Sequence, residues 1–374
     1  MTTKRKITRR GFLRMTTGAA ALPSLGILSV GSIPARAAST DPLIRRSGNL
    51  LKRGDERFIA VGINQYILNR EWQEPCEAFF VHRAAIYDRF VELGFNAQRI
   101  GFWAKSYAEP DGFLSKSVQR ERIRRICVEA AERGIYSLIC LWDTVGQNTE
   151  ADLARSREHG FPMFEDLMKM PGIGDNPYVM FNPWCEPGIV AHDIWYRHFE
   201  LTIRSLRSMG YKGVIFIDTP TWSWTFREVQ VSGHVDSLLA LDENICFANH
   251  RYPQGDLEKG YEYLGDARRK HVEEVLQYVG KYPILGSEYG WHAFLDGPGG
   301  ASQNHPLWIS QLLDHFVDVD IPAGLNGVLL WKWNWMPDGL TIPENYTREG
   351  MLTLSQYGNI ANNHLWSRLK GKKM

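Results

Sequence analysis

The stretch Tyr178-Val-Met-Phe-Asn-Pro-Trp-Cys-Glu-Pro-Gly188 carries the feature around which the rest of the chain is interpreted. It begins with apolar residues, as does a strand that is buried on both faces. It ends in a single acid, Glu186, between Cys185 and Pro187. A carboxylate at the mouth of a buried strand is costly to remove from water, so its presence there indicates a functional role.

Seven other short apolar segments are also predicted to be strands, because they are bounded by turn residues and show little polar alternation. These segments cover residues 57–64, 95–100, 136–142, 213–218, 244–249, 283–286 and 327–331. Helical periodicity fills most of the intervals between them. The predicted helices cover residues 78–93, 116–133, 190–209, 256–279 and 306–318, with further helix inside 147–176 and before 241.

Strands that alternate with helices imply parallel pairing through right-handed crossovers. Eight such units in a chain of 374 residues predict an α/β fold of one domain, a (β/α)8 TIM barrel. A doubly wound open sheet is the alternative fold. Its usual Gly-rich phosphate turn is missing after the first strand, where the sequence reads Gly62-Ile-Asn-Gln-Tyr66.

Residues 1–37 are predicted to be a twin-arginine (Tat) signal peptide. Arg9 and Arg10 precede Phe-Leu, a weakly apolar run and an Ala-x-Ala site that ends at Ala37. The apolar run is too short and too broken by Gly and Pro to span a bilayer stably. We therefore expect cleavage after Ala37 and a mature domain over residues 38–374, located in the periplasm or secreted.

The composition argues against several classes of partner. The mature chain has 36 basic and 42 acidic residues, so nothing indicates binding to nucleic acid. The chain contains 13 Trp, which suggests an aromatic-lined cleft in addition to a core. Five irregularly spaced cysteines imply neither a disulfide framework nor a zinc site. The histidines show no HxH or HExxH spacing, so no metal is expected, and no nucleotide cofactor motif is present.

The C-terminal strand ends of a barrel carry its function, because they meet at one face. The residues predicted at these ends are acids, hydrogen-bonding groups and indoles: Asn64, Arg99, Trp103, Trp142, Glu186, Asp218, Trp222, Trp224, His250, Tyr252, Glu288 and Trp331. Two carboxylates on different strands, Glu186 and Glu288, are what glycoside hydrolysis requires. Indoles would pack against the apolar faces of sugar rings. Asp218 could contact a sugar hydroxyl, although acids in loops are usually only solvated.

Several motifs together resemble the clan A glycoside hydrolases, most of all glycoside hydrolase family 5, the cellulase-like barrels. These motifs are Gly94-Phe-Asn-Ala-Gln-Arg-Ile100, Cys185-Glu-Pro187, His250-Arg-Tyr252, Pro283-Ile-Leu-Gly-Ser-Glu-Tyr-Gly290 and Trp331. The resemblance covers essentially residues 45–370. It implies a (β/α)8 catalytic domain and retaining hydrolysis of a β-linked polysaccharide or oligosaccharide, cellulase-like or mannanase-like.

The resemblance also implies a role for individual residues. Glu186 would be the acid/base and Glu288 the nucleophile, with Arg99 and Tyr252 supporting Glu288. The implied substrate-binding residues are Arg99, Trp103, Trp142, Cys185, His250, Tyr252 and Trp331. No cofactor is implied.

Two positions depart from the family pattern. Cys185 stands where the family has an Asn that hydrogen-bonds the sugar 2-hydroxyl, and Trp142 stands where cellulase-like members often have His. A thiol is a weak donor. Two alternatives therefore stay open, a non-catalytic carbohydrate-binding barrel and a transglycosylase of exopolysaccharide metabolism. Sugar identity, linkage, endo or exo action and oligomeric state cannot be deduced from this pattern.

Overall fold

The structure is a computed structural model that describes residues 41–68, 73–108, 115–252, 272–290, 306–333, 339–341 and 346–372. The predicted leader and its cleavage site lie outside these residues and stay a prediction. In the part of the chain that is described, no helix combines the length and the apolar character needed to cross a membrane.

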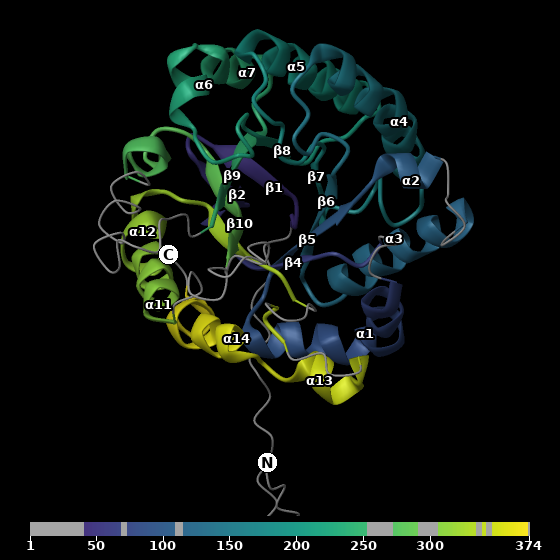
Figure 1. Cartoon of the computed structure of the whole chain (residues 1–374), viewed down its shortest axis with the longest axis vertical. Coiled ribbons are helices and arrows are strands. Elements are labelled where there is room, and N and C mark those ends of the chain that lie inside the picture. The colour runs from purple at the N-terminus through teal and green to yellow at the C-terminus, as the bar shows by residue number, and fades with distance from the viewer. Residues whose placement is uncertain are drawn as a thin grey trace, which may run out of the picture. The chain divides into compact units, whose positions relative to one another are not determined.

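Eight parallel strands close into a barrel in the order β10-β11-β4-β5-β6-β7-β8-β9, surrounded by helices (Figure 1). The strands are β4 (Ala60–Gln65), β5 (Ala97–Phe102), β6 (Tyr136–Leu141), β7 (Val179–Asn182), β8 (Ile215–Asp218), β9 (Ile245–Arg251), β10 (Ile284–Gly290) and β11 (Gly327–Trp331). Apart from Arg251, every residue in them is buried. This burial on both faces explains the apolar runs. The predicted barrel and all eight predicted strands are confirmed, with shifts of a few residues at their ends.

Helices follow most strands and cover the outside of the barrel (Figure 1). They are α1 (Gln73–Leu93), α2 (Ala104–Ala108), α3 (Lys116–Ala131), α4 (Glu150–Met168), α5 (His192–Ser208), α6 (Arg227–Val231), α7 (His234–Leu241), η3 (Val272–Leu276), α9 (Gln277–Val279), α11 (Pro306–His315), η4 (Phe316–Asp320), α12 (Ile321–Ala323), α13 (Arg348–Leu352), α14 (Gln356–Ala361), η6 (Asn362–Trp366) and α15 (Ser367–Leu369). Ser115 and Thr149 cap α3 and α4 by accepting a backbone N–H in the first turn.

One predicted helix is wrong in detail. The helix expected before residue 241 consists of two short helices, α6 and α7, in the structure. Gly233 separates them with a left-handed φ of 79°, a conformation that glycine adopts without steric cost.

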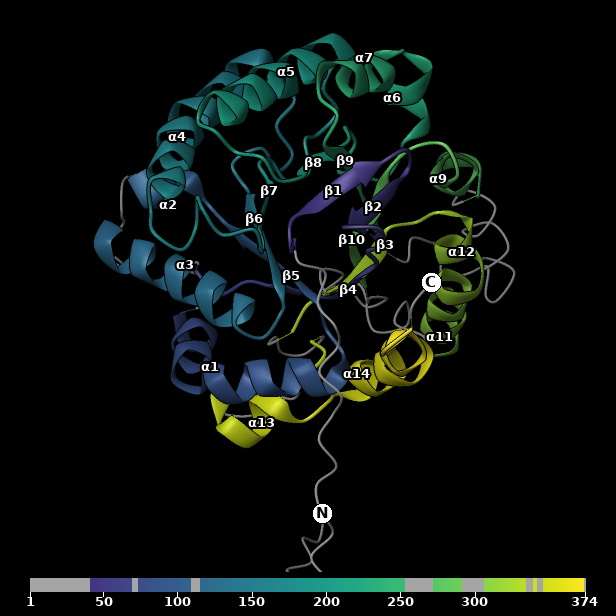
Figure 2. The ribbon, with the colours of Figure 1, turned by 180° about the vertical axis from the view of Figure 1, so that it is seen from behind.

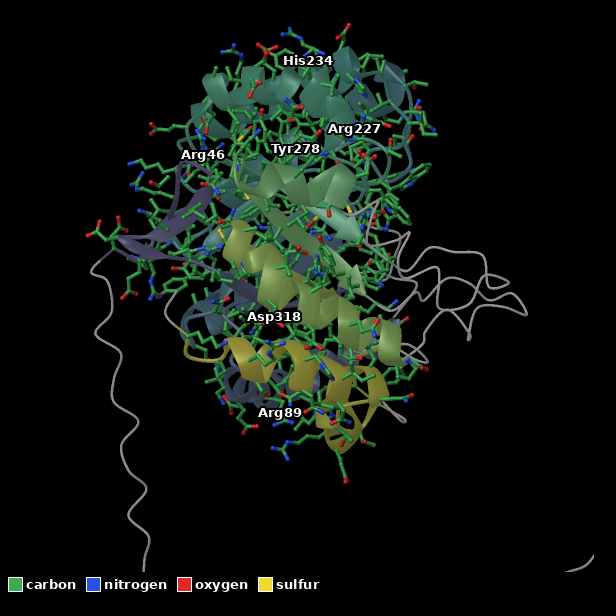
Figure 3. The ribbon with its side chains drawn as sticks, turned by 90° about the vertical axis from the view of Figure 1, so that its left-hand side faces the viewer. Arg46, Arg89, Arg227, His234, Tyr278 and Asp318 are labelled. Carbon is green, nitrogen blue, oxygen red and sulfur yellow. The ribbon has the colours of Figure 1, made fainter. Side chains whose placement is uncertain are left out.

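A small antiparallel sheet, which the sequence did not predict, closes the N-terminal end of the barrel (Figure 2). It consists of β1 (Ile44–Ser47), β2 (Leu50–Arg53) and β3 (Glu56–Arg57). The backbone N–H of Leu51 donates to Oδ1 of Asn326 at 2.7 Å, and that of Arg46 donates to Oδ1 of Asn244 at 2.8 Å. Both asparagines precede barrel strands, so this sheet covers the end opposite the functional face. Figure 3 shows Arg46 at that end of the barrel.

Candidate active site

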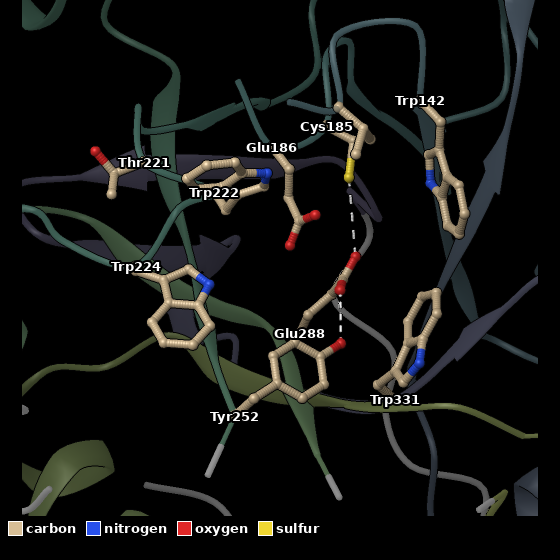
Figure 4. Close-up of a pocket in the computed structure, with 10 residues that line it drawn as sticks. Trp142, Cys185, Glu186, Thr221, Trp222, Trp224, Tyr252, Glu288 and Trp331 are labelled. Carbon is tan, nitrogen blue, oxygen red and sulfur yellow. Dashed lines mark hydrogen bonds between the residues drawn. The ribbon is translucent and has the colours of Figure 1, made fainter. Parts of the chain in front are cut away.

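A cavity of about 580 Å³ opens where the barrel strands end (Figure 4). Its lining is formed by Trp142, Val145, Cys185, Glu186, Thr221, Trp222, Trp224, Tyr252, Glu288 and Trp331. Six of the nine predicted site residues therefore line one cavity, namely Trp142, Cys185, Glu186, Tyr252, Glu288 and Trp331. The order of the strands places them together, because the C-terminal ends of β6, β7, β9, β10 and β11 point to one face.

Glu288, on β10, is held by donors on both carboxylate oxygens. Arg99 Nη1 donates to Oε1, and the Tyr252 hydroxyl donates to Oε2 at 2.7 Å. Arg99 is 1% exposed and Glu288 is 5% exposed, so water hardly screens this ion pair. The two donors therefore fix the orientation of the Glu288 carboxylate, and Arg99 places a positive charge beside it.

Glu186 lies directly after β7 in a backbone conformation that is unusual for a residue with a side chain. Its φ is 47°, in the left-handed region. Its backbone N–H donates to Asp218 Oδ2 at 2.9 Å, and its carbonyl accepts from Gly146 N at 3.0 Å. Burial, and then the negative charge of Asp218, raises the pKa of Glu186 to about 8. Glu186 can therefore carry a proton at neutral pH.

His250 is buried and contacts the carboxyl group of Glu186. Its Nδ1 lies 2.6 Å from Glu186 Oε1, and its Nε2 lies 3.4 Å from Asp218 Oδ2. Burial lowers the pKa of His250, although Glu288 and Asp218 oppose this effect. The imidazole is therefore neutral at neutral pH. His250 was expected to bind substrate, but the structure places it fully buried behind the acids.

The two catalytic candidates lie close enough to act on one bond. One carboxylate oxygen of Glu186 and one of Glu288 are within 4.8 Å of each other. Retaining glycosidases have their two carboxyl groups roughly 5–5.5 Å apart, whereas inverting ones leave roughly 6.5–9.5 Å for a water. The structure thus brings the two acids to one side of the cavity at close range, which the sequence could not establish.

Arg99 is the centre of a buried polar network beneath the cavity. Its Nε donates to Asn182 Oδ1 at 2.7 Å, and its Nη1 donates to Asn64 Oδ1 at 3.1 Å. Its Nη2 lies 3.1 Å from Cys185 Sγ and 3.7 Å from Asp218 Oδ2. Arg99 was expected to support Glu288, and the geometry places it there rather than on the cavity surface.

Cys185 lines the cavity beside the acids and remains a neutral thiol. Burial raises the pKa of Cys185 well above its usual range. Its S–H points to Glu288 Oε1 at 3.9 Å, while Arg99 donates to the sulfur. The thiol therefore completes the packing around Glu288 with only a weak hydrogen bond.

Trp142 and Trp331 form one wall of the cavity. Their rings stack 5.6 Å apart, and Tyr66 stacks on Trp142 at 4.1 Å and lies 6.5 Å from Trp331. Trp103 contributes through Trp142, against which its ring packs edge-on at 6.3 Å. This cluster explains why an indole is accommodated at residue 142, because its flat ring packs against two neighbouring aromatic rings.

Trp222 and Trp224, here called the β8-loop indoles, lie on the other side of Glu186 (Figure 4). Both stood at a predicted strand end but received no role. Thr221, Trp222 and Ser223 all have left-handed φ values, from 54° to 59°. Hydrogen bonds fix this loop to the Glu186 loop, from Thr221 N to Gly188 O and from Trp222 N to Pro187 O, both at 2.9 Å. Sequence periodicity carries no signal for such contacts between loops.

Asp218 differs from the expectation of a solvated acid or a sugar contact. Its side chain is fully buried, and Asn182 Nδ2 donates to its Oδ1 at 2.8 Å. It accepts the Glu186 N–H with the other oxygen. A short strand that ends in Asp was the available signal, but burial of the acid depends on donors from β7, from Glu186 after it and from Arg99 of β5.

Glu186, His250 and Glu288 also have the spacing of a possible cation site, with one donor atom from each within 4.8 Å of the others. Their polar contacts are already accounted for by partners within the protein. Arg99 already supplies a positive charge to Glu288, and His250 is engaged with Glu186. The donor set therefore fits a proton-transfer site.

Two carboxylates within reach of one glycosidic bond, in a cleft with indole walls at the strand ends of a barrel, place this protein among the glycosidases. The family model "Cellulase (glycosyl hydrolase family 5)" matches residues 59–315, which is more than half of the chain. The chain therefore belongs to glycosyl hydrolase family 5. No curated protein sequence matches it.

Solved structures with the same fold are similar over most of their length. A cellulase is 16% identical, with a TM-score of 0.63, over 89% of this chain and 95% of that one. A β-mannanase from Streptomyces thermolilacinus, solved with mannohexaose, is 16% identical, with a TM-score of 0.60, over 88% and 97%. A β-glucanase from Saccharophagus degradans, solved with cellotetraose, is 15% identical, with a TM-score of 0.62, over 90% and 98%.

Proposed function

We propose that this glycosidase hydrolyses a β-linked gluco- or manno-configured polysaccharide or oligosaccharide with retention of anomeric configuration. The observation that carries this proposal is the separation of at most 4.8 Å between carboxylate oxygens of Glu186 and Glu288. No water fits between two carboxyl groups and a sugar at that spacing, so direct attack by a carboxylate is favoured. The oligosaccharides bound by the mannanase and the glucanase support the substrate class.

The proposed reaction has two steps. In the first, a carboxylate oxygen of Glu288 bonds to the anomeric carbon, the glycosidic bond breaks, and Glu186 gives its proton to the leaving oxygen. In the second, Glu186 takes a proton from water, whose oxygen bonds to the anomeric carbon and displaces Glu288. Arg99 and Tyr252 hold the carboxylate of Glu288 in place for the attack. The raised pKa of Glu186 provides the proton.

Product analysis tests the proposal. The mature protein is incubated with β-1,4-glucan, mannan, xylan and β-1,3-glucan oligomers, and the first anomer released is identified by proton NMR. We expect β-anomers from glucan or mannan oligomers. Release of α-anomers, or binding of the oligomers without turnover, would contradict the proposal. The second result would instead support the carbohydrate-binding alternative.

The pH dependence of kcat/KM is expected to show a basic limb near pH 8. Glu186 must be protonated in the free enzyme, and its pKa of about 8 means that activity is present below this pH and lost above it. Glu186→Gln should reduce kcat/KM for phenyl β-cellobioside or mannobioside about 10²–10⁴-fold. The corresponding glycosyl fluorides lose fluoride without a proton, so the variant should retain their kcat/KM. A parallel loss on both substrates would argue against the acid role.

Transglycosylation is a second candidate activity, because the β8-loop indoles lie beside Glu186, the proposed proton donor to the leaving group, where an acceptor sugar would enter. Trp222→Ala or Trp224→Ala should lower kcat/KM for oligosaccharides roughly tenfold, the effect of about 1.4 kcal/mol of ring contact. Hydrolysis of glycosyl fluorides should be unaffected. Transfer to added cellobiose or mannobiose should fall in parallel with kcat/KM for oligosaccharides.

Val231→Ala provides the control for that experiment, since Val231 is an exposed apolar side chain on α6. Its kcat/KM values and product ratios should equal those of the unaltered protein. If the Trp variants change fluoride hydrolysis as much as oligosaccharide hydrolysis, the indoles act on the reaction centre and not on the leaving group.

A further inference from the structure

Asp218 is a third buried acid in the site, and the two-carboxylate reaction does not use it. Its side chain has no exposed surface, and Glu186, Glu288 and Tyr252 line the cavity without it. A buried carboxylate is costly unless donors surround it. Here the donors are the Asn182 amide at 2.8 Å and the Glu186 N–H at 2.9 Å, with Arg99 Nη2 at 3.7 Å.

The first contact explains the backbone of Glu186. A left-handed φ on a residue with a side chain costs about 1–3 kcal/mol and persists only where the surroundings enforce it. Asp218 binds the Glu186 N–H, while Thr144 Oγ1 donates to the carbonyl of Cys185 at 2.6 Å. The peptide plane before Glu186 is therefore held on both sides. This orientation directs the Glu186 side chain into the cavity, as Figure 4 shows.

The second contact concerns the proton on His250. A neutral imidazole carries one N–H, and its partners select which nitrogen bears it. Nε2 lies 3.4 Å from Asp218 Oδ2 without a hydrogen bond, and the nearby carboxylate oxygen favours the proton on this nitrogen electrostatically. Nδ1 is then an acceptor 2.6 Å from Glu186 Oε1. A ring nitrogen without a proton can only accept at that distance, so this contact favours the protonated form of Glu186.

We propose that Asp218 is a positioning residue for the acid/base Glu186, acting through the Glu186 N–H and through the tautomer of His250. The proposal rests on the proposed function, because it concerns how Glu186 is kept ready to donate a proton. The charged and titratable groups that face Glu186 come from every neighbouring strand end: Arg99, Cys185, Asp218, His250, Tyr252 and Glu288. Among the negative groups, Asp218 is the one that raises the pKa of Glu186 after burial.

Asp218→Asn tests the proposal because it removes the charge and retains the shape. An amide at residue 218 can donate to Nε2, which moves the His250 proton to Nδ1 and lets it donate to ionised Glu186. We expect the basic limb of kcat/KM for phenyl β-cellobioside or mannobioside to move down by about one pH unit. At pH 9, above both limbs, the rate should fall about 10-fold, while kcat/KM for the corresponding glycosyl fluoride should change less than 3-fold.

Asp242→Asn is the matched control, because Asp242 is a partly buried acid paired with Arg207 away from the cavity. Its pH profile should equal that of the unaltered protein. An unshifted basic limb in Asp218→Asn, or an equal loss on the fluoride, would overturn the positioning role. Absence of turnover by the unaltered protein on both substrates would instead refute the proposed function.

A measurement on the unaltered protein covers the case in which Asp218→Asn does not fold. Nitrogen-15 NMR of labelled histidine, with the His250 signal assigned by His250→Gln, reports the tautomer directly. We expect a neutral ring with the proton on Nε2 at pH 6–7. A proton on Nδ1, or a cationic ring in that range, would overturn the proposal.

Discussion

Glu288→Gln is expected to reduce kcat for an aryl β-cellobioside or mannobioside by about 10⁴-fold or more, with the fold retained. The amide has the shape of the carboxylate but cannot form the glycosyl-enzyme bond. The side-chain amide also has one acceptor oxygen where the carboxylate has two, so Arg99 and Tyr252 can no longer each donate to a separate oxygen. Initial rates, together with the circular dichroism spectrum and the thermal midpoint, measure both parts of this expectation.

Two controls make the result specific. Glu165→Gln removes a half-exposed carboxylate of α4 whose partner is Lys169, and its activity should be unchanged. Glu288→Ala leaves space for azide, which should restore turnover by bonding to the anomeric carbon and give a glycosyl azide of inverted configuration. Substantial hydrolysis by Glu288→Gln, or no azide product, would remove Glu288 from the role of nucleophile.

Arg99→Met is expected to lower the free energy of unfolding by about 3–5 kcal/mol at pH 7.5, the cost of leaving buried charge unpaired. Glu288 and Asp218 would lose the cation that lies against both of them. A buried acid without a partner is less costly in its uncharged form, so part of the missing stability should be recovered as the pH falls. Urea unfolding at pH 7.5 and at pH 5 should show a smaller difference from the unaltered protein at pH 5.

Arg204→Met is the comparison, since Arg204 makes an exposed pair with Glu200 on α5. Exposed substitutions usually change stability by less than about 0.5 kcal/mol. Equal losses in Arg99→Met and Arg204→Met, or a loss that does not depend on pH, would show that the buried ion pairs do not hold the barrel mouth together.

The barrel could be predicted because its strands differ chemically from everything else in the chain. Segments such as 136–142 and 213–218 are apolar without alternation, which marks strands covered by helices. The β1–β3 sheet could not be predicted in this way. Residues 44–57 contain three apolar residues and five basic ones, and their strands are held to the barrel end by Asn244 and Asn326.

The residues of the candidate site were largely predicted, but their arrangement was not. Glu186, Tyr252 and Glu288 stand at strand ends, and the barrel topology brings any such residues to one face. The separation of the acids and the burial of Asp218 depend on hydrogen bonds between separate strands and loops. Sequence periodicity predicts strands and helices, but it does not indicate which loop donates a hydrogen bond to which other loop.

The attachment of the β8-loop indoles to the Glu186 loop has a consequence for protein engineering and for divergence within the family. Thr221 and Trp222 bind the backbone of Pro187 and Gly188, so one structural unit carries both the acid and the surface beside it. Insertions or deletions in either loop would turn the acid away from its bond and abolish activity. Exchange of the indole side chains alone leaves the backbone contacts intact. New leaving-group preferences are therefore accessible by point substitution at Trp222 and Trp224, and inaccessible by changes of loop length.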